Sequence, residues 1–218
     1  MKRVAILLAG CGSGDGSEIQ ESVLALTALS EAGIAYECFA MNKAQKEVVD
    51  HLCGEATGQT RVQIVEAARI ARGAVRDFSE LCAEDFDAVV IPGGFGTAKN
   101  FFSFAADGIG FSVDEDYRRV VSEFHSAGKP VAAMCIAPLS LPAIIEGVTI
   151  TLGERGELAE AAEAHYGATV LASGVSEAVV DSLNRVITVP CYMYSEATVA
   201  EIAAGARSMV GELSSMLG

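Results

Sequence analysis

The most constraining feature of the sequence is an uninterrupted apolar run at residues 4–9 that leads directly into a glycine-rich turn at residues 10–17. A strand exposed on one face alternates apolar and polar residues, whereas a continuous run is typical of a strand covered on both faces. The next stretch shows apolar residues at helical spacing: Ile19, Val23, Leu26 and Leu29. The chain therefore begins with a predicted central parallel strand and an amphipathic helix over residues 18–33, with Ser17 as its expected N-cap and Gly33 as its stop.

The same alternation continues along the chain. Further strands are predicted at residues 35–40, 88–91, 130–134 and 168–171, and helices near residues 60–72, 114–127, 158–166 and 196–217. Residues 179–189 indicate a hairpin that turns at residues 181–184. This order predicts an α/β fold, with a doubly wound and mostly parallel sheet sandwiched by helices. No linker-like stretch interrupts it, so we expect one domain over residues 1–218.

Two stretches depart from this rhythm and are expected to form loops or short helices over the strand ends: residues 44–58 and 93–112. The second contains a cluster of phenylalanines at residues 101–111, which could form a dimer surface, a pocket lid or part of the core, and we favour the core: Phe101, Phe102, Phe104 and Phe111.

The charge balance limits the classes of molecule that the protein can bind. Fifteen basic against twenty-nine acidic residues give a formal net charge of -14, which repels phosphate polyanions and anionic lipid surfaces. We therefore expect no nucleic acid and no membrane as partner, but a small molecule. The apolar run at residues 4–9 is shorter than a signal-peptide core, and no run approaches the ~18 apolar residues that span a membrane, so we expect a cytoplasmic protein.

The six cysteines are scattered and include no CxxC pair, which argues against a zinc ribbon and a thioredoxin-type redox centre. We expect no metal and mainly reduced, buried thiols. Cys135 stands out because it follows the strand at residues 130–134 and precedes a predicted helix over residues 136–145. A helix N-terminus lowers the pKa of a thiol, so Cys135 is either a reactive thiolate or a small buried hydrophobe.

Ligands of open parallel sheets bind beyond the carboxyl ends of the strands. Glu21, one turn into the first helix, is a possible proton acceptor there, although a solvated surface charge is the commoner role. The adjacent glycines Gly93 and Gly94 can direct backbone N–H groups at an oxyanion. Cys11 and Cys191 follow other strands and, like Gly93, are expected to line the pocket.

Other catalytic signatures are incomplete. In the first glycine turn, Asp15 replaces the third glycine of the dinucleotide fingerprint, so nicotinamide binding is not expected. The sequence contains neither a GxSxG nucleophile motif nor a phosphate-binding P-loop. No histidine occupies a position that indicates a Cys-His pair.

Four segments, taken together and in order, resemble the ElbB proteins of the ThiJ/PfpI branch of the glutamine-amidotransferase-like superfamily: residues 10–21, 91–100, 128–138 and 186–193. The resemblance implies a flavodoxin-like, class I glutamine amidotransferase-like sandwich that is usually a homodimer. It also implies a nucleophilic Cys135 hydrogen-bonded to Glu21, with backbone amides of Gly94 and Ile136 as the oxyanion site. Similar proteins are associated with a glyoxalase activity that needs no cofactor and no glutathione.

The turn at Cys135 continues with Ile136 and Ala137, where PfpI-type proteases often have a histidine. Hydrolysis of a peptide or of glutamine needs an acid that protonates the leaving amine. We therefore expect neither a protease nor a glutamine amidotransferase, but a glyoxalase that converts methylglyoxal or glyoxal to a 2-hydroxy acid through a hemithioacetal on Cys135. The alternative is a redox sensor or stress-response binding protein, in which Cys135 is oxidised to a sulfinic acid held by Glu21.

Overall fold

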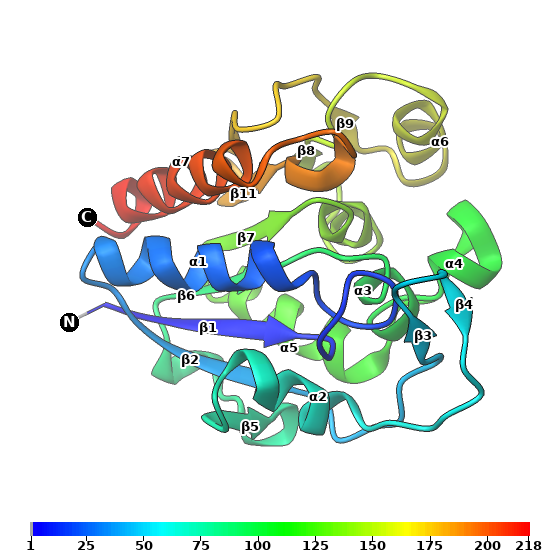
Figure 1. The fold of residues 1–218 in the computed structure, drawn as a ribbon. Coiled ribbons are helices and arrows are strands. Elements are labelled where there is room, and N and C mark those ends of the chain that lie inside the picture. The colour runs from blue at the N-terminus through cyan, green and yellow to red at the C-terminus, as the bar shows by residue number, and fades with distance from the viewer. Residues whose placement is uncertain (1) are drawn as a thin grey trace.

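A computed structural model describes residues 2–218, which contain a seven-stranded sheet in the order β10-β11-β7-β6-β1-β2-β5 (Figure 1). Its strands are β1 (Arg3–Leu8), β2 (Ala35–Ala40), β5 (Val75–Asp77), β6 (Ala88–Ile91), β7 (Val131–Met134), β10 (Val179–Asp181) and β11 (Val186–Val189). Every neighbouring pair is parallel except the β10–β11 hairpin. The predicted mostly parallel α/β sheet is confirmed.

Helices cover both faces of this sheet (Figure 1). The longer ones are α1 (Ile19–Glu31), α2 (Gln63–Ile70), α5 (Glu115–Ser126), α6 (Glu157–Tyr166) and α7 (Val199–Leu217). Because α1 and α7 lie side by side on one face and α5 lies on the other, every residue of β6 and β7 is buried. No helix within residues 2–218 is both long and apolar enough to cross a membrane.

Several short elements complete the fold. Residues 44–58, expected to be loop or short helix, contain the hairpin of β3 (Val49–Asp50) and β4 (Glu55–Ala56). Residues 93–112, for which the expectation was the same, contain the short helices α3 (Thr97–Asn100) and α4 (Phe104–Asp107). The strand predicted at residues 168–171 is shorter and lies outside the main sheet: β9 (Thr169–Val170) pairs with β8 (Thr149–Ile150). Neither β8 nor β5 was predicted, since two or three residues are too few to show a period.

The phenylalanine-rich stretch belongs to the core, as predicted. Phe101 is fully buried, and its ring stacks on the Tyr117 ring at 4.7 Å between centroids. Phe102 and Phe111 are also buried and pack against each other, while Phe104 is partly buried against the same cluster.

Two local predictions near the strand ends are wrong. Ser17 does not cap α1, because its hydroxyl accepts the Ala9 N–H at 2.9 Å and so closes the glycine turn. Glu18 is the N-cap instead, and its Oε2 accepts the Glu21 N–H at 2.6 Å. The segment after Cys135 is a 3₁₀-helix, η4 (Ala137–Ala143), rather than an α-helix over residues 136–145, because Pro142 within it has no N–H to donate.

Candidate functional site

Cys135 lies at a sharp turn directly after β7. Its φ angle is +59°, a left-handed conformation that a non-glycine residue rarely adopts and that costs about 1–3 kcal/mol. The Cys135 N–H donates to the carbonyl of Val189 at 2.9 Å, which ties the turn to the neighbouring strand β11. The predicted strand–turn arrangement around this cysteine is therefore present, and the backbone holds it under strain.

Gly93 lies directly against Cys135. A Cβ atom on Gly93 would overlap the Cys135 Cβ and would lie 2.7 Å from Glu21 Oε2 and 2.8 Å from the Met134 carbonyl oxygen. Only a residue without a side chain fits at this point of closest approach between β6, β7 and α1. Gly93 thus lets the thiol and the carboxyl meet.

Glu21 points from α1 into the same place and is completely buried. Its Oε2 accepts the Gly93 N–H at 3.0 Å, and its Oε1 accepts the Tyr192 N–H at 3.2 Å. The Cys135 side chain is also close enough to this carboxyl to affect its pKa. Each partner comes from a different strand end, so the fold fixes the carboxyl in one orientation.

The proton balance of this pair differs from the sequence-based expectation of a low-pKa thiolate. Burial raises the pKa of Glu21 to about 8, with a further increase from Glu18. Burial also raises the pKa of the Cys135 thiol well above its ordinary value; Glu21 adds to this, while the amides of Gly94 and Ile136 lower it. Burial therefore favours the protonated form of both groups.

Packing raises the pKa of the Cys135 thiol. Cys135 is 7% exposed, and a short 3₁₀-helix follows it, so desolvation outweighs the helix dipole. The backbone amides of Gly94 and Ile136, which the resemblance assigns to an oxyanion, lie close enough to the sulfur to lower the pKa of the thiol. Both groups of the pair therefore favour their neutral forms, and two backbone N–H groups lie beside the sulfur.

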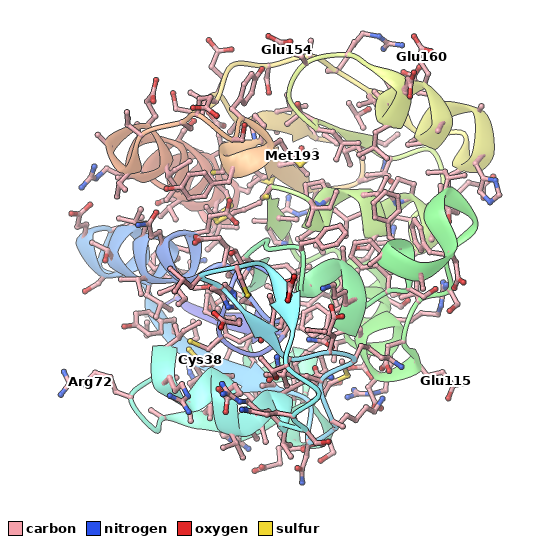
Figure 2. The ribbon with its side chains drawn as sticks, turned by 45° about the vertical axis from the view of Figure 1, so that its right-hand side comes forward. Cys38, Arg72, Glu115, Glu154, Glu160 and Met193 are labelled. Carbon is pink, nitrogen blue, oxygen red and sulfur yellow. The ribbon has the colours of Figure 1, made fainter. Side chains whose placement is uncertain are left out.

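A cavity of about 450 Å³ opens in front of the pair. Nine residues line it: Ser13, Gly14, Glu18, Gly94, Phe95, Cys135, Ile136, Tyr192 and Met193. Met193, labelled in Figure 2, lies on the short helix η5 (Cys191–Met193) that follows β11. A cavity of this size accommodates a small organic molecule.

The structure separates the three residues expected to line the pocket. Gly93 lies beneath Cys135 and Glu21, as described above. Cys191 is fully buried and does not line the cavity. Burial raises the pKa of its thiol, and Glu21 raises it further. Cys11 is also not a lining residue; its charged neighbours are Arg69, Glu66 and Asp15.

Sequence reasoning missed Glu18 and Tyr192. A carboxylate at a helix start is commonly a solvated charge, yet Glu18 is partly buried, and burial raises the pKa of its carboxyl. Tyr192 supplies a backbone donor to Glu21, and its hydroxyl donates to Gln20. These contacts join residues about 170 positions apart, which no local spacing reveals. The one available signal was that Tyr192 follows a predicted strand.

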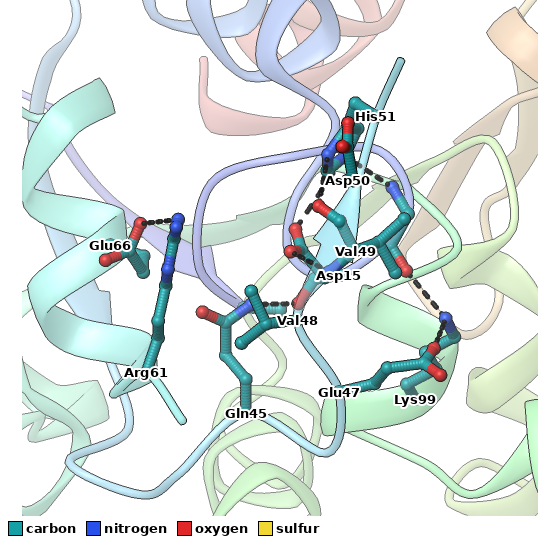
Figure 3. A network of polar contacts seen from close by, with 12 residues as sticks. Asp15, Gln45, Glu47, Val48, Val49, Asp50, His51, Arg61, Glu66 and Lys99 are labelled. Carbon is teal, nitrogen blue, oxygen red and sulfur yellow. Dashed lines mark hydrogen bonds and ion pairs between the residues drawn. The ribbon is translucent and has the colours of Figure 1, made fainter. Parts of the chain in front are cut away.

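The glycine turn at residues 10–17, which provides Ser13 and Gly14 to the cavity, is held by a polar network around Asp15 (Figure 3). Asp15 Oδ2 accepts the Val49 N–H at 2.9 Å, and His51 Nε2 accepts the Gly14 N–H at 3.1 Å. Lys99 donates to the Gly14 carbonyl at 2.8 Å. The β3–β4 hairpin therefore braces this wall from outside.

Comparison with known proteins shows the family of the chain. A family model described as the DJ-1/PfpI family matches residues 2–188. The chain is 42% identical over 201 residues to the human "glutamine amidotransferase-like class 1 domain-containing protein 3, mitochondrial", covering 88% of this chain and 75% of that protein. It is 33% identical over 207 residues to the zebrafish "ES1 protein, mitochondrial", covering 88% and 77%.

Among solved structures, an "isoprenoid biosynthesis protein with amidotransferase-like domain" from Ehrlichia chaffeensis is similar with a TM-score of 0.93 and 36% identity, covering 100% of both chains. Glyoxalase III from Candida albicans is similar with a TM-score of 0.61 and 13% identity, covering 98% of this chain and 96% of that one. The second likeness concerns the fold alone.

Proposed function

The chain belongs to the DJ-1/PfpI family, and from this premise we propose that it is an ElbB-type member acting as a glyoxalase. The proposed substrate is a small 2-oxoaldehyde such as methylglyoxal or glyoxal, converted to the 2-hydroxy acid without glutathione or a cofactor. The observation that carries the proposal is the contact between the Cys135 thiol and the Glu21 carboxyl in front of a cavity of small-molecule size. We place the reaction in the cytoplasm and in a homodimer.

The reaction begins when the pair loses one proton to solvent. In one of the two resulting forms the sulfur is a thiolate and Glu21 keeps its proton. The thiolate attacks the aldehyde carbon C1, and Glu21 gives its proton to the oxygen formed there, which leaves a hemithioacetal and a carboxylate. The amides of Gly94 and Ile136 lie at the sulfur and are the available backbone donors for negative charge on oxygen.

The next step moves a hydrogen from C1 to C2. The Glu21 carboxylate removes the C1 proton to form an enediolate and then returns it to C2, while the C1 hydroxyl proton passes to the C2 oxygen. C1 is oxidised and C2 is reduced by the same two electrons, so no external redox partner is needed. Water then hydrolyses the thioester to the 2-hydroxy acid and restores the thiol.

This mechanism explains why no histidine is required. The product leaves through water attack on a thioester, whose thiolate leaving group needs no protonation by a second acid, unlike the amine released from a peptide or from glutamine. One buried carboxyl that exchanges protons at C1 and C2 suffices. A pKa of about 8 gives Glu21 access to both protonation states near physiological pH.

The test is lactate formation from methylglyoxal without glutathione by wild type, Cys135→Ala and Glu21→Gln. Cys135→Ala should abolish turnover, and Glu21→Gln should reduce kcat by about 10²–10⁴-fold. Since catalysis begins with loss of a proton from the pair, kcat/KM of the wild type should rise from pH 6 to pH 8. Full activity of Cys135→Ala would refute the mechanism.

The redox-sensor alternative uses the same two residues but needs a thiolate in the resting protein. Because burial and Glu21 raise the pKa of Cys135, the thiol should react slowly with mild peroxide at neutral pH. Peptide mass spectrometry after peroxide treatment separates the two functions. Rapid and selective oxidation of Cys135, combined with negligible turnover of 2-oxoaldehydes, would favour the sensor.

A further inference from the structure

The cavity wall carries one acidic side chain and no basic one: Glu18 is a lining residue, and no Lys, Arg or His is among the nine. We propose that Glu18 is a specificity-determining residue that admits uncharged or cationic aldehydes to Cys135 and rejects anionic ones, such as those carrying a carboxylate or a phosphate. This inference rests on the proposed function, because it names the class of substrate for the same site.

The N-terminus of α1 does not counteract this selection. A free helix N-terminus at a pocket attracts anions through its unpaired N–H groups. Here the Glu18 carboxyl occupies that position, since it caps α1 by accepting the Glu21 N–H, and the neighbouring amides of Ile19 and Gln20 lower its pKa. The chain thus supplies its own anion to the helix, and a second anion in the cavity meets a carboxylate.

The nearest cation is also occupied. Lys99 lies behind the cavity wall, with its Nζ 5.3 Å from the ring centroid of Phe95. Its ammonium group donates to Glu47 and to the carbonyl of Gly14, and its side chain is only 15% exposed. Lys99 therefore holds the loop in place and is matched by its own carboxylate, so it offers no free charge to an anionic substrate.

The size of the effect follows from the size of the cavity. A space of about 450 Å³ is about 9 Å across, so a ligand bound at Cys135 carries its charge within about 8 Å of Glu18. At an effective dielectric constant of about 20–40, two unit charges at this separation change a rate by about six- to thirtyfold. The negative charge of the whole protein acts in the same direction but is screened over about 10 Å at 0.1 M salt.

Alkylation of Cys135 by two reagents of nearly the same shape provides the test: iodoacetamide is neutral and iodoacetate is an anion. The rates at Cys135 are followed by peptide mass spectrometry, and their ratio is divided by the same ratio for N-acetylcysteine. Both reagents attack the same thiolate at the same pH, so the ratio does not depend on the thiolate fraction. In the wild type this normalised ratio should favour iodoacetamide by about tenfold.

Glu18→Gln, which keeps an oxygen to cap α1, should bring the normalised ratio close to one. Glu18→Asp keeps the charge and should retain most of the preference. Glu160→Gln removes one negative charge from α6, at the top of Figure 2, and should leave the ratio unchanged. An unchanged ratio in Glu18→Gln, or a loss of preference as large in Glu160→Gln, would overturn the proposal.

A second measurement does not depend on any variant folding. Raising the salt concentration from 0.05 M to 0.5 M should reduce the wild-type preference severalfold through screening, and a ratio independent of salt would contradict the proposal. Neither measurement requires turnover of an aldehyde. If the wild type prefers iodoacetamide and Glu18→Gln loses this preference, but no aldehyde is turned over, the proposed reaction alone is refuted. If aldehydes are turned over but Glu18→Gln has the same ratio as the wild type, the selectivity alone is refuted.

Discussion

Replacing Glu21 with Gln should remove a strong pH dependence from the stability of the protein. Burial raises the pKa of Glu21 from its ordinary value of 4.5 to about 8, so the folded state binds this proton more tightly than the unfolded chain. The stabilising contribution is complete below pH 4.5 and is lost as the pH rises through 8. At 1.36 kcal/mol for each pH unit, the interval from 4.5 to 8 corresponds to about 5 kcal/mol.

Urea unfolding of wild type and Glu21→Gln at pH 5.5, 6.5 and 7.5 measures this effect. The free energy of unfolding of the wild type should fall relative to the variant by about 1.4 kcal/mol per pH unit, or about 2.7 kcal/mol over the range. The amide of Gln makes different hydrogen bonds with Gly93 and Tyr192, which shifts the whole curve but adds no slope. Using the difference between the two proteins cancels the titration of all groups that do not interact with Glu21.

Glu160→Gln serves as the matched control, because Glu160 is exposed on α6 and its replacement removes the same formal charge. Its stability curve should run parallel to that of the wild type. Parallel curves for wild type and Glu21→Gln would refute the reasoning, since they would mean that Glu21 is ionised in the folded protein at pH 5.5. The thiol would then be the group that keeps the proton of the pair.

Three further predictions concern the surroundings of the pair. Gly93→Ala should cost about 1–3 kcal/mol of unfolding free energy, because its Cβ would collide with Cys135, and should also slow alkylation of that thiol. Asn100→Ala should cost about 2–4 kcal/mol in urea unfolding, since the buried side chain makes three hydrogen bonds of 2.9 Å. With a chromogenic disulfide reagent, exposed Cys53 should react at once, whereas Cys38, whose pKa burial raises to about 11, should react only on unfolding.

Local sequence patterns predicted the framework of the fold well. The apolar run at residues 4–9 predicted the buried strand β1. The spacing of apolar residues from Ile19 to Leu29 predicted α1 within two residues at each end, although Ile19 and Val23 are exposed. The position of Cys135 directly after a predicted strand was confirmed, whereas its left-handed backbone conformation was not predicted. Each of these features depends on residues close together in the chain, which is where periodicity and turn chemistry carry information.

The proton balance and the cavity wall depended on contacts that local patterns do not encode. The helix dipole predicted a lowered pKa for the Cys135 thiol. Burial raises this pKa instead, and the segments that bury the thiol are distant from one another in the sequence. Glu18 was interpreted as a solvent-exposed charge because nothing in its neighbours along the chain indicates the cavity. The short strands β5 and β8 were missed because they form through pairing with distant segments.

The carboxyl of Glu21 is fastened from two separate parts of the chain. Gly93 follows β6 and Tyr192 follows β11, so two strand ends that are distant in the chain hold the same carboxyl. Tyr192 and Met193 also line the cavity. Exchanging residues 190–194 would therefore change both the shape of the cavity and the hydrogen bonding of Glu21.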